Sequence, residues 1–195
     1  MAVPALFDAA ADTYDDDPHH LVIARELVSG LRPAPTPGLV VDVATGTGFA
    51  ALTALETLSP RHVLAIDVSP RMIAKAAAKT NRVEWRVAPA VPLDLPDGAA
   101  DVVLCASALH LIGAAAPPEW RRVLRPGGQV AFSIPMAADF HPSPAFAATL
   151  PTDLAVPADE AGAERIARAA GFGSVRVTTT PGPRRSFLVF AEVDA

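Results

Sequence analysis

Short apolar runs alternate along the chain with segments in which apolar residues recur every three or four positions. The runs predict buried strands and the periodic segments predict helices. The predicted strands are residues 38–43, 61–67, 81–87, 101–106, 129–134, 173–180 and 185–193. Two strand-helix units in a row, at 38–58 and 61–79, imply parallel strands joined by right-handed crossovers, whereas the short turn at 181–183 makes the last strand a hairpin partner. The pattern predicts an α/β, doubly wound, mostly parallel seven-stranded sheet with an antiparallel last strand in a single domain.

Two helical segments precede the first strand. Residues 5–15 carry a weak amphipathic pattern, and Asp17-Pro18 has the composition of a helix start for a second helix that reaches about Ser29. His19 and His20 fall in the first turn of that helix, where we interpret them as solvated. Prolines at 33, 35 and 37 predict a stiff linker into the first strand.

A glycine turn follows the first strand in the sequence Val41-Asp42-Val43-Ala44-Thr45-Gly46-Thr47-Gly48. Its spacing, Gly46-x-Gly48-x-x-Ala51, satisfies a dinucleotide fingerprint, with Asp67 at the distance of a ribose-binding acid. Asp42 argues against a dinucleotide, because a carboxylate at the strand tip would repel a pyrophosphate. It suits a ligand with an ammonium group, and both acids stand at the carboxyl edge of the sheet, where α/β folds bind ligands.

The segment from Val41 to Gly48 resembles the first motif of class I S-adenosylmethionine-dependent methyltransferases, in particular the type 11, UbiE-like domain. The resemblance covers nearly the whole chain and implies a Rossmann-like fold. It implies an enzyme that transfers a methyl group from S-adenosylmethionine to an O, N or C nucleophile of a small-molecule acceptor by in-line displacement. The expected parts are an N-terminal helical flap (1–30), a cofactor-binding half (38–134) and a substrate-side linker, helix and hairpin (135–195).

The resemblance also assigns roles to residues. It implies that Tyr14 on the flap contacts the cofactor, that Asp67 accepts the ribose hydroxyls, and that Val68 and Met72 flank the adenine. The family commonly has an acid after the third strand, where this chain has Ala88-Pro89-Ala90, so only backbone contacts to adenine are expected there. The candidate cofactor-binding residues are Tyr14, Asp42, Ala44, Thr45, Gly46, Gly48, Asp67, Val68, Met72, Pro89, Ala90 and Ala106.

No catalytic residue is conspicuous. His110 follows the fourth strand and is the first candidate general base, because histidine titrates near working pH, and His141 on the later linker is the second. Each has a structural alternative as an ordinary loop histidine. No metal is expected, because the five histidines lack zinc-type spacing with Cys105. An acidic metal site from Asp94, Asp97 and Asp101 is the alternative, although turn and strand-start roles explain these acids more simply.

The charge and composition of the chain limit the classes of substrate and the cellular compartments that are expected. The net charge is −5, the chain holds two lysines, and the first twenty residues carry five aspartates and no Lys or Arg, which disfavours a nucleic-acid substrate. A single cysteine, the lack of a signal-peptide pattern and the lack of a long apolar run predict a cytoplasmic protein that does not enter a membrane. The sequence leaves a homodimer open.

Two other functions compete with the enzyme. A member of the fold that binds the cofactor or a partner without transferring methyl is the first alternative, favoured by the missing acid and the lack of a clear base. A NAD(P)-dependent reductase is the second. It is disfavoured by Asp42 and by the absence of a Tyr-x-x-x-Lys pair, since Tyr14 is the only tyrosine.

Overall fold

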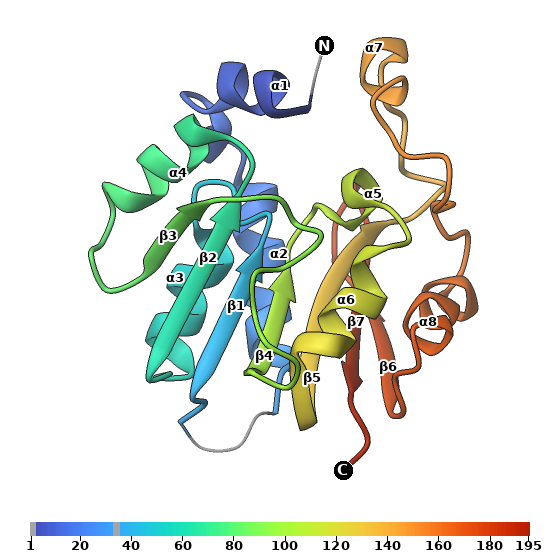
Figure 1. The fold of residues 1–195 in the computed structure, drawn as a ribbon. Coiled ribbons are helices and arrows are strands. Elements are labelled where there is room, and N and C mark those ends of the chain that lie inside the picture. Colours follow the sequence, from blue (N-terminus) through green and yellow to red (C-terminus); the bar gives the residue numbers. More distant parts are fainter. Residues whose placement is uncertain (1–2, 33–35) are drawn as a thin grey trace.

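The computed structural model describes residues 3–32 and 36–195, and within these residues seven strands form one sheet (Figure 1). The strands are β1 (Leu39–Val43), β2 (His62–Asp67), β3 (Glu84–Val87), β4 (Ala100–Cys105), β5 (Leu124–Pro135), β6 (Val175–Thr179) and β7 (Ser186–Glu192). Their order is β3-β2-β1-β4-β5-β7-β6; β1 to β5 are parallel, and β7 is antiparallel to both of its neighbours. The predicted fold class is confirmed. The predicted proline linker lies mostly outside the described residues.

Helices cover both faces of the sheet (Figure 1). They are α1 (Val3–Ala10), the 3-10 helix η1 (Tyr14–Asp16), α2 (Pro18–Gly30), α3 (Phe49–Thr57), α4 (Pro70–Ala77), α5 (Leu109–Ile112), α6 (Ala116–Val123), α7 (Pro144–Ala147) and α8 (Glu160–Ala169). Side chains alternate across each strand, so Val40 packs with α2 and α3, whereas Val41 faces the core on the side of α6 and α8. Burial on both faces explains why these strands are almost entirely apolar.

Most predicted elements are present, and their ends follow local chemistry. Asp17, Ser69 and Asp159 each cap the helix that follows, by accepting a hydrogen bond from a backbone N–H in its first turn. The third strand is shorter than predicted and begins at Glu84. The linker after β5 is not wholly irregular, because it contains the short helix α7.

Two local predictions were wrong. The helix predicted over residues 5–15 ends at Ala10, and Tyr14 lies in the separate turn η1. The strand predicted over residues 129–134 begins earlier, at Leu124, and residues 125–128 form a bulge inside β5, because Ala100 pairs with Leu124 while Val102 pairs with Gln129. Backbone hydrogen bonds that join Gly127 and Gly128 to Val193 hold this bulge against the end of the chain.

The strand order reverses direction between β1 and β4, which are direct neighbours in the sheet. The loops after these two strands leave a crevice at the carboxyl edge, the usual ligand site of an open α/β sheet. Figure 1 shows α1 lying across this edge, above β2 and α4. Among the described residues, no helix combines the length and the apolar character needed to span a membrane.

Candidate functional site

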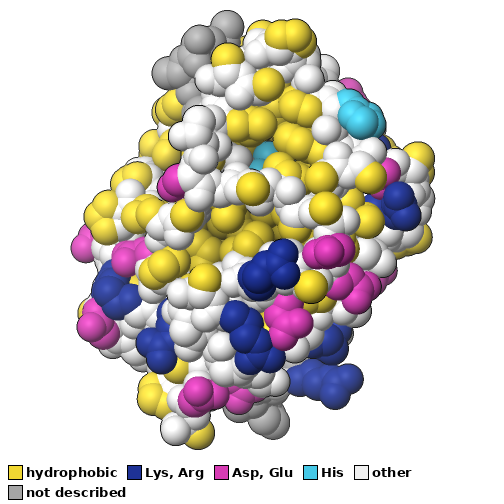
Figure 2. Space-filling view, turned by 90° about the vertical axis from the view of Figure 1, so that its right-hand side faces the viewer, with side chains coloured by type: hydrophobic (Ala, Val, Ile, Leu, Met, Phe, Trp, Pro, Cys, Tyr) yellow, Lys and Arg dark blue, Asp and Glu magenta, His cyan; other side chains and the backbone are white. Residues whose placement is uncertain are grey.

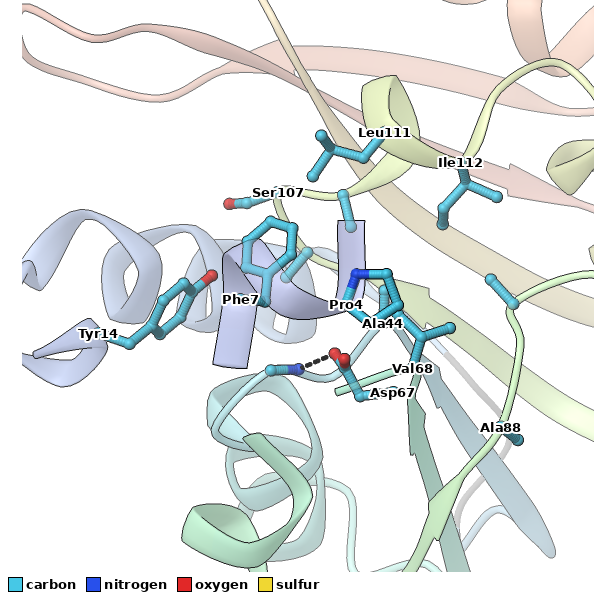
Figure 3. Close-up of a pocket in the computed structure, with 14 residues that line it drawn as sticks. Pro4, Phe7, Tyr14, Ala44, Asp67, Val68, Ala88, Ser107, Leu111 and Ile112 are labelled. Carbon is cyan, nitrogen blue, oxygen red and sulfur yellow. Dashed lines mark hydrogen bonds between the residues drawn. The ribbon is translucent and has the colours of Figure 1, made fainter. Parts of the chain in front are cut away.

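A cavity of about 260 Å³ lies at the carboxyl edge of the sheet, under the N-terminal segment. Pro4 and Phe7 of α1 form its roof, and the loops after β1, β2, β3 and β4 form its floor and walls (Figure 3). Tyr14 closes one side, next to the glycine turn. The predicted flap therefore covers the predicted site.

Asp67 stands on the wall of this cavity with 8% of its surface exposed. Its Oδ2 accepts a hydrogen bond from the Gly46 N–H at 2.8 Å, shown dashed in Figure 3, and its Oδ1 accepts one from the Ser69 N–H at 2.9 Å. Burial raises the pKa of this carboxyl, although the backbone N–H groups act in the opposite direction. The carboxylate thus fixes the turn after β1 and still faces open space.

Asp42 is fully buried behind the same turn and does not form part of the cavity wall. Its Oδ2 accepts hydrogen bonds from Thr45 Oγ1 at 2.5 Å and from the Ala51 N–H at 2.9 Å, whereas its Oδ1 has no partner. Burial raises the pKa of Asp42 to about 7. A buried carboxylate oxygen without a donor is costly, so this atom fits a ligand that brings a positive, hydrogen-bonding group.

The backbone is strained where the crevice opens. Ala44, directly after β1, has φ 54°, and Ser107, shortly after β4, has φ 60°. Both residues line the cavity, and non-glycine residues in this region are uncommon away from functional sites. Gly46 also has positive φ, at 56°, and its backbone forms part of the wall.

Several other predicted cofactor residues line the cavity, and several do not. Val68, Ala90 and Ala106 are in its wall. Met72 is completely buried on the inner face of α4 and is not in the cavity wall, so its place beside the adenine stays a prediction. Pro89 lines a different cavity beside β3, and its contact with the cofactor also stays a prediction.

The glycine turn holds two further predicted residues that lie outside the wall. Thr45 donates its hydroxyl to Asp42 and so braces the turn from within. Gly48 has φ 92° and begins α3, and a Cβ there would lie 2.6 Å from the Trp85 ring. The structure therefore gives Gly48 an architectural role, which its spacing alone did not reveal.

The acidic N-terminal segment is bound to α4. Asp8 accepts a hydrogen bond from Ser69 Oγ at 2.6 Å. Asp12 forms an ion pair with Arg71 at 2.7 Å. Asp15 forms another with Lys79, also at 2.7 Å. From the sequence, these acids were expected only to disfavour a nucleic-acid substrate. In the structure they hold the flap over the cavity.

A second cavity of about 330 Å³ adjoins the first. His110 of α5 lines it, with 8% of its surface exposed, and its Nδ1 has no hydrogen-bond partner. The ring of Phe140 meets His110 edge-on, with centroids 5.2 Å apart. Burial lowers the pKa of His110 to about 4, so it is neutral at pH 7. His141, the second candidate base, is exposed and is not in the wall of either cavity, whereas its neighbour Phe140 lines the second one, so a role for His141 stays a prediction.

The second cavity also contains a histidine that sequence reasoning missed. His20 stacks on Tyr14, with ring centroids 4.3 Å apart, and burial lowers its pKa to about 4. The expectation of a solvated helix start is therefore wrong for His20. Its spacing of three and four residues from Ile23 and Ala24, which are both buried, places it on the inner face of α2 and was the available signal.

In the described ranges 3–32 and 36–195, no group of three or more His, Cys, Asp or Glu side chains is arranged to hold a metal ion. Asp101, part of the acidic alternative, is near the start of β4, at the edge of the sheet opposite the cavity. There it pairs with Arg125 and accepts a hydrogen bond from the Leu39 N–H. The alternative metal site therefore does not form around Asp101.

Comparisons with known proteins agree with this geometry. Residues 40–128, a little under half of the chain, match the family model described as a methyltransferase domain. Malonyl-[acyl-carrier protein] O-methyltransferase of Marinomonas sp. (strain MWYL1) is 31% identical over 137 residues, 65% of this chain and 49% of the relative. The 23S rRNA (guanine(748)-N(1))-methyltransferase of Streptomyces fradiae is 35% identical over 132 residues, 61% of this chain and 45% of the relative. The chain thus matches about half the length of these curated relatives.

Solved structures share the fold. A chain from the complex between the Haloferax volcanii Trm112 methyltransferase activator and a methyltransferase superposes with a TM-score of 0.78 at 20% identity, covering 97% of this chain and 98% of that one. Burkholderia thailandensis 1,6-didemethyltoxoflavin-N1-methyltransferase, solved with its substrate and S-adenosylhomocysteine, gives 0.72 at 21% identity, covering 100% and 92%. The fold is the one that S-adenosylmethionine-dependent methyltransferases share. Residues 40–128 carry the similarity to the methyltransferase-domain family.

Proposed function

We propose that the protein transfers a methyl group from S-adenosylmethionine to an O, N or C atom of a small-molecule acceptor by in-line displacement. The observation that carries the proposal is the pair of acids at the tips of β1 and β2. Asp67 faces the cavity, and Asp42 lies buried behind the turn with Oδ1 unpartnered. A dinucleotide would bring negative charge to this place, whereas the amino-acid end of S-adenosylmethionine brings an ammonium.

The residues present fit this cofactor. Asp67 uses one lone pair of each oxygen on a backbone N–H, so both oxygens can still accept a ribose hydroxyl. The Ala88 and Ala90 side chains and Val68 provide an apolar wall for the adenine ring. Asp42 would attract the ammonium across the turn without touching it, and the nearby positive charge would lower the pKa of Asp42 from about 7.

When bound, the cofactor supplies a methyl group already activated by a sulfonium, whose S–C bond breaks as the acceptor atom bonds to the methyl carbon. The chain must then orient the acceptor and exclude water, and orientation alone can lower the barrier by about 7–11 kcal/mol. The flap over the first cavity would exclude water from the reacting atoms. His110, neutral at pH 7, would accept a hydrogen bond from the acceptor and orient it, and its lowered pKa makes it a weak general base.

A small-molecule acceptor is favoured over RNA, although one relative is named for its action on 23S rRNA. The mouth of the site is built by a segment rich in aspartate, and the net charge of the chain is −5. Phosphate backbones require clustered Lys and Arg instead. The cavity next to the first one has aromatic side chains in its wall, and its arginines are paired with aspartates.

Methyl transfer is tested with S-adenosylmethionine labelled on its methyl group, incubated with a small-molecule extract and, separately, with ribosomal RNA. Label in a small molecule supports the proposal. Label in RNA alone refutes the proposed acceptor class. Binding of the labelled cofactor with no transfer to any extract supports the alternative of a non-catalytic binding member of the fold. An Asp67→Ala variant, which loses the carboxylate on the cavity wall, is the control for transfer that does not depend on this site.

A further inference from the structure

The second cavity meets the first along a shared wall. Phe7, Tyr14, Ser107 and Leu111 line both cavities, so a molecule in the second cavity lies directly beside a molecule in the first. Figure 3 shows the Phe7 ring and the Ser107 side chain, two of these shared residues, in the wall of the first cavity. Figure 2 shows hydrophobic side chains gathered around a hollow in the upper part of the molecule, with a histidine at its base.

The second cavity carries polar atoms that have no partner within the protein. His20 Nδ1, His110 Nδ1 and Ser107 Oγ are all buried and make no hydrogen bond. They come from three different elements, α2, α5 and the loop after β4, yet all three residues line this one cavity. Buried polar atoms are almost always satisfied, so three such atoms around one cavity point to a ligand that supplies their partners.

The charged residues around this cavity neutralise one another. Both terminal nitrogens of the Arg184 guanidinium donate to the Asp17 carboxylate, at 2.7 and 2.8 Å. Arg185 donates to the Asp139 carboxylate at 2.7 Å through Nε and 3.2 Å through Nη2. Among the described residues in this wall, every carboxylate and guanidinium is therefore paired. A charged ligand would have to be desolvated here with no free counter-charge to receive it.

The remaining surface is largely aromatic. Tyr14 and His20 form a parallel stack with 12° between their planes, and Phe140 stands edge-on to His110 at 77°. Phe146 is tilted toward His110, with centroids 6.5 Å apart. Flat rings in both stacked and edge-on orientations match the preferences of a planar aromatic ligand.

We propose that the second cavity is the acceptor site and that it takes an uncharged aromatic molecule whose hydroxyl hydrogen-bonds to His20 or His110. This inference rests on the proposed function for its biological meaning, since it names the class of methyl acceptor. The histidines serve as hydrogen-bond acceptors in it. Because the arginines and aspartates around the cavity neutralise one another, no free charge remains to receive a carboxylate or an ammonium ion.

The probes are 2-naphthol, naphthalene and 2-naphthoate, which share one ring system and differ in the polar group. Their binding to the full chain is measured by fluorescence, with and without S-adenosylhomocysteine. We expect 2-naphthol to bind roughly three- to tenfold more tightly than naphthalene, the effect of one hydrogen bond, and at least about tenfold more tightly than 2-naphthoate. Naphthoate binding as tight as naphthol, or no preference for naphthol over naphthalene, overturns the inference.

Variants assign the preference to the imidazoles. His20→Phe and His110→Phe keep a ring in each position, and together they should abolish the preference for naphthol over naphthalene. His62→Phe, on the exposed start of β2 far from both cavities, should keep it. A preference that survives the double substitution overturns the assignment. S-adenosylhomocysteine affinity, measured on the same variants, reports whether the first cavity is intact.

The two proposals fail in different ways. Failure of the unmodified chain to bind S-adenosylhomocysteine refutes the proposed function, whatever the naphthols do. S-adenosylhomocysteine binding without a preference for 2-naphthol refutes only the acceptor class.

Discussion

Replacing Asp42 by Asn tests the electrostatic reasoning about the buried acid. The ordinary pKa of the carboxyl is 3.8, and burial in the folded protein raises it to about 7. Between these two values the folded state binds more protons than the unfolded state. The free energy of unfolding therefore falls as pH rises from about 4 to about 7, by about 1.4 kcal/mol per pH unit from this group.

The magnitude follows from the chosen pH values. At about pH 5 the folded carboxyl is still protonated, whereas at about pH 8 it is ionised, so Asp42 should lower the stability by about 2–3 kcal/mol between the two conditions. The amide side chain of the Asp42→Asn variant does not titrate. Its oxygen can keep the hydrogen bonds from Thr45 and Ala51, while its NH2 takes the place of the unpartnered Oδ1.

The assay is urea unfolding of both proteins at the two pH values without ligand. The stability of Asp42→Asn relative to the unmodified chain should rise by about 2–3 kcal/mol on going from about pH 5 to about pH 8, because all other titrating groups cancel in the difference. Asp94→Asn, at an exposed position, controls for the loss of one carboxylate. Parallel pH profiles for Asp42→Asn and the unmodified chain would refute the argument that burial makes Asp42 an unfavourable charge.

Three further outcomes are expected. Gly48→Ala should lower the free energy of unfolding in urea by about 2–4 kcal/mol, because its Cβ would meet Trp85 at 2.6 Å. Gly182→Ala, with a similar φ and open space around it, should lower the free energy of unfolding by only about 1 kcal/mol. Equal losses would contradict the steric argument. His110→Ala should lower kcat roughly ten- to a hundredfold and leave S-adenosylhomocysteine affinity unchanged in calorimetry; an unchanged kcat removes His110 from the mechanism. Raising NaCl from about 50 to about 500 mM should speed the release of S-adenosylhomocysteine roughly two- to fivefold in stopped-flow measurements. The reason is that salt screens the exposed ion pairs that hold the flap, such as Asp12 with Arg71. A constant rate would show that the flap does not control release.

The sequence predicted the sheet well because its signals are local. The central strands are short apolar runs, which burial on both faces makes conspicuous, whereas the partly exposed β3 and β6 alternate apolar and polar residues. The helix caps were predictable for the same reason, since Asp17-Pro18 and Ser69-Pro70 carry their own start signals. The bulge at 125–128 was not predictable, because it depends on pairing with β4 and with the end of the chain.

The site was predicted in outline and missed in detail. Asp42 and Asp67 lie at the carboxyl ends of β1 and β2, which meet at one edge of the sheet, so their proximity followed from topology. Which side of each loop faces the cavity did not: Ala88 and Ala90 face it, and Pro89 between them does not. His20 was missed because its environment is made by Tyr14, which reaches it through the turn η1.

The central claim is that the acids at the tips of β1 and β2 receive a cationic amino-acid nucleoside. The measurement that tests it most directly is titration calorimetry of the unmodified chain with S-adenosylmethionine and, separately, with NADH. We predict saturable binding of S-adenosylmethionine and no binding of NADH. Asp67→Ala should weaken the binding of S-adenosylmethionine by at least about tenfold, because the variant loses hydrogen bonds to a charged group. Binding of NADH with none of S-adenosylmethionine would contradict the account.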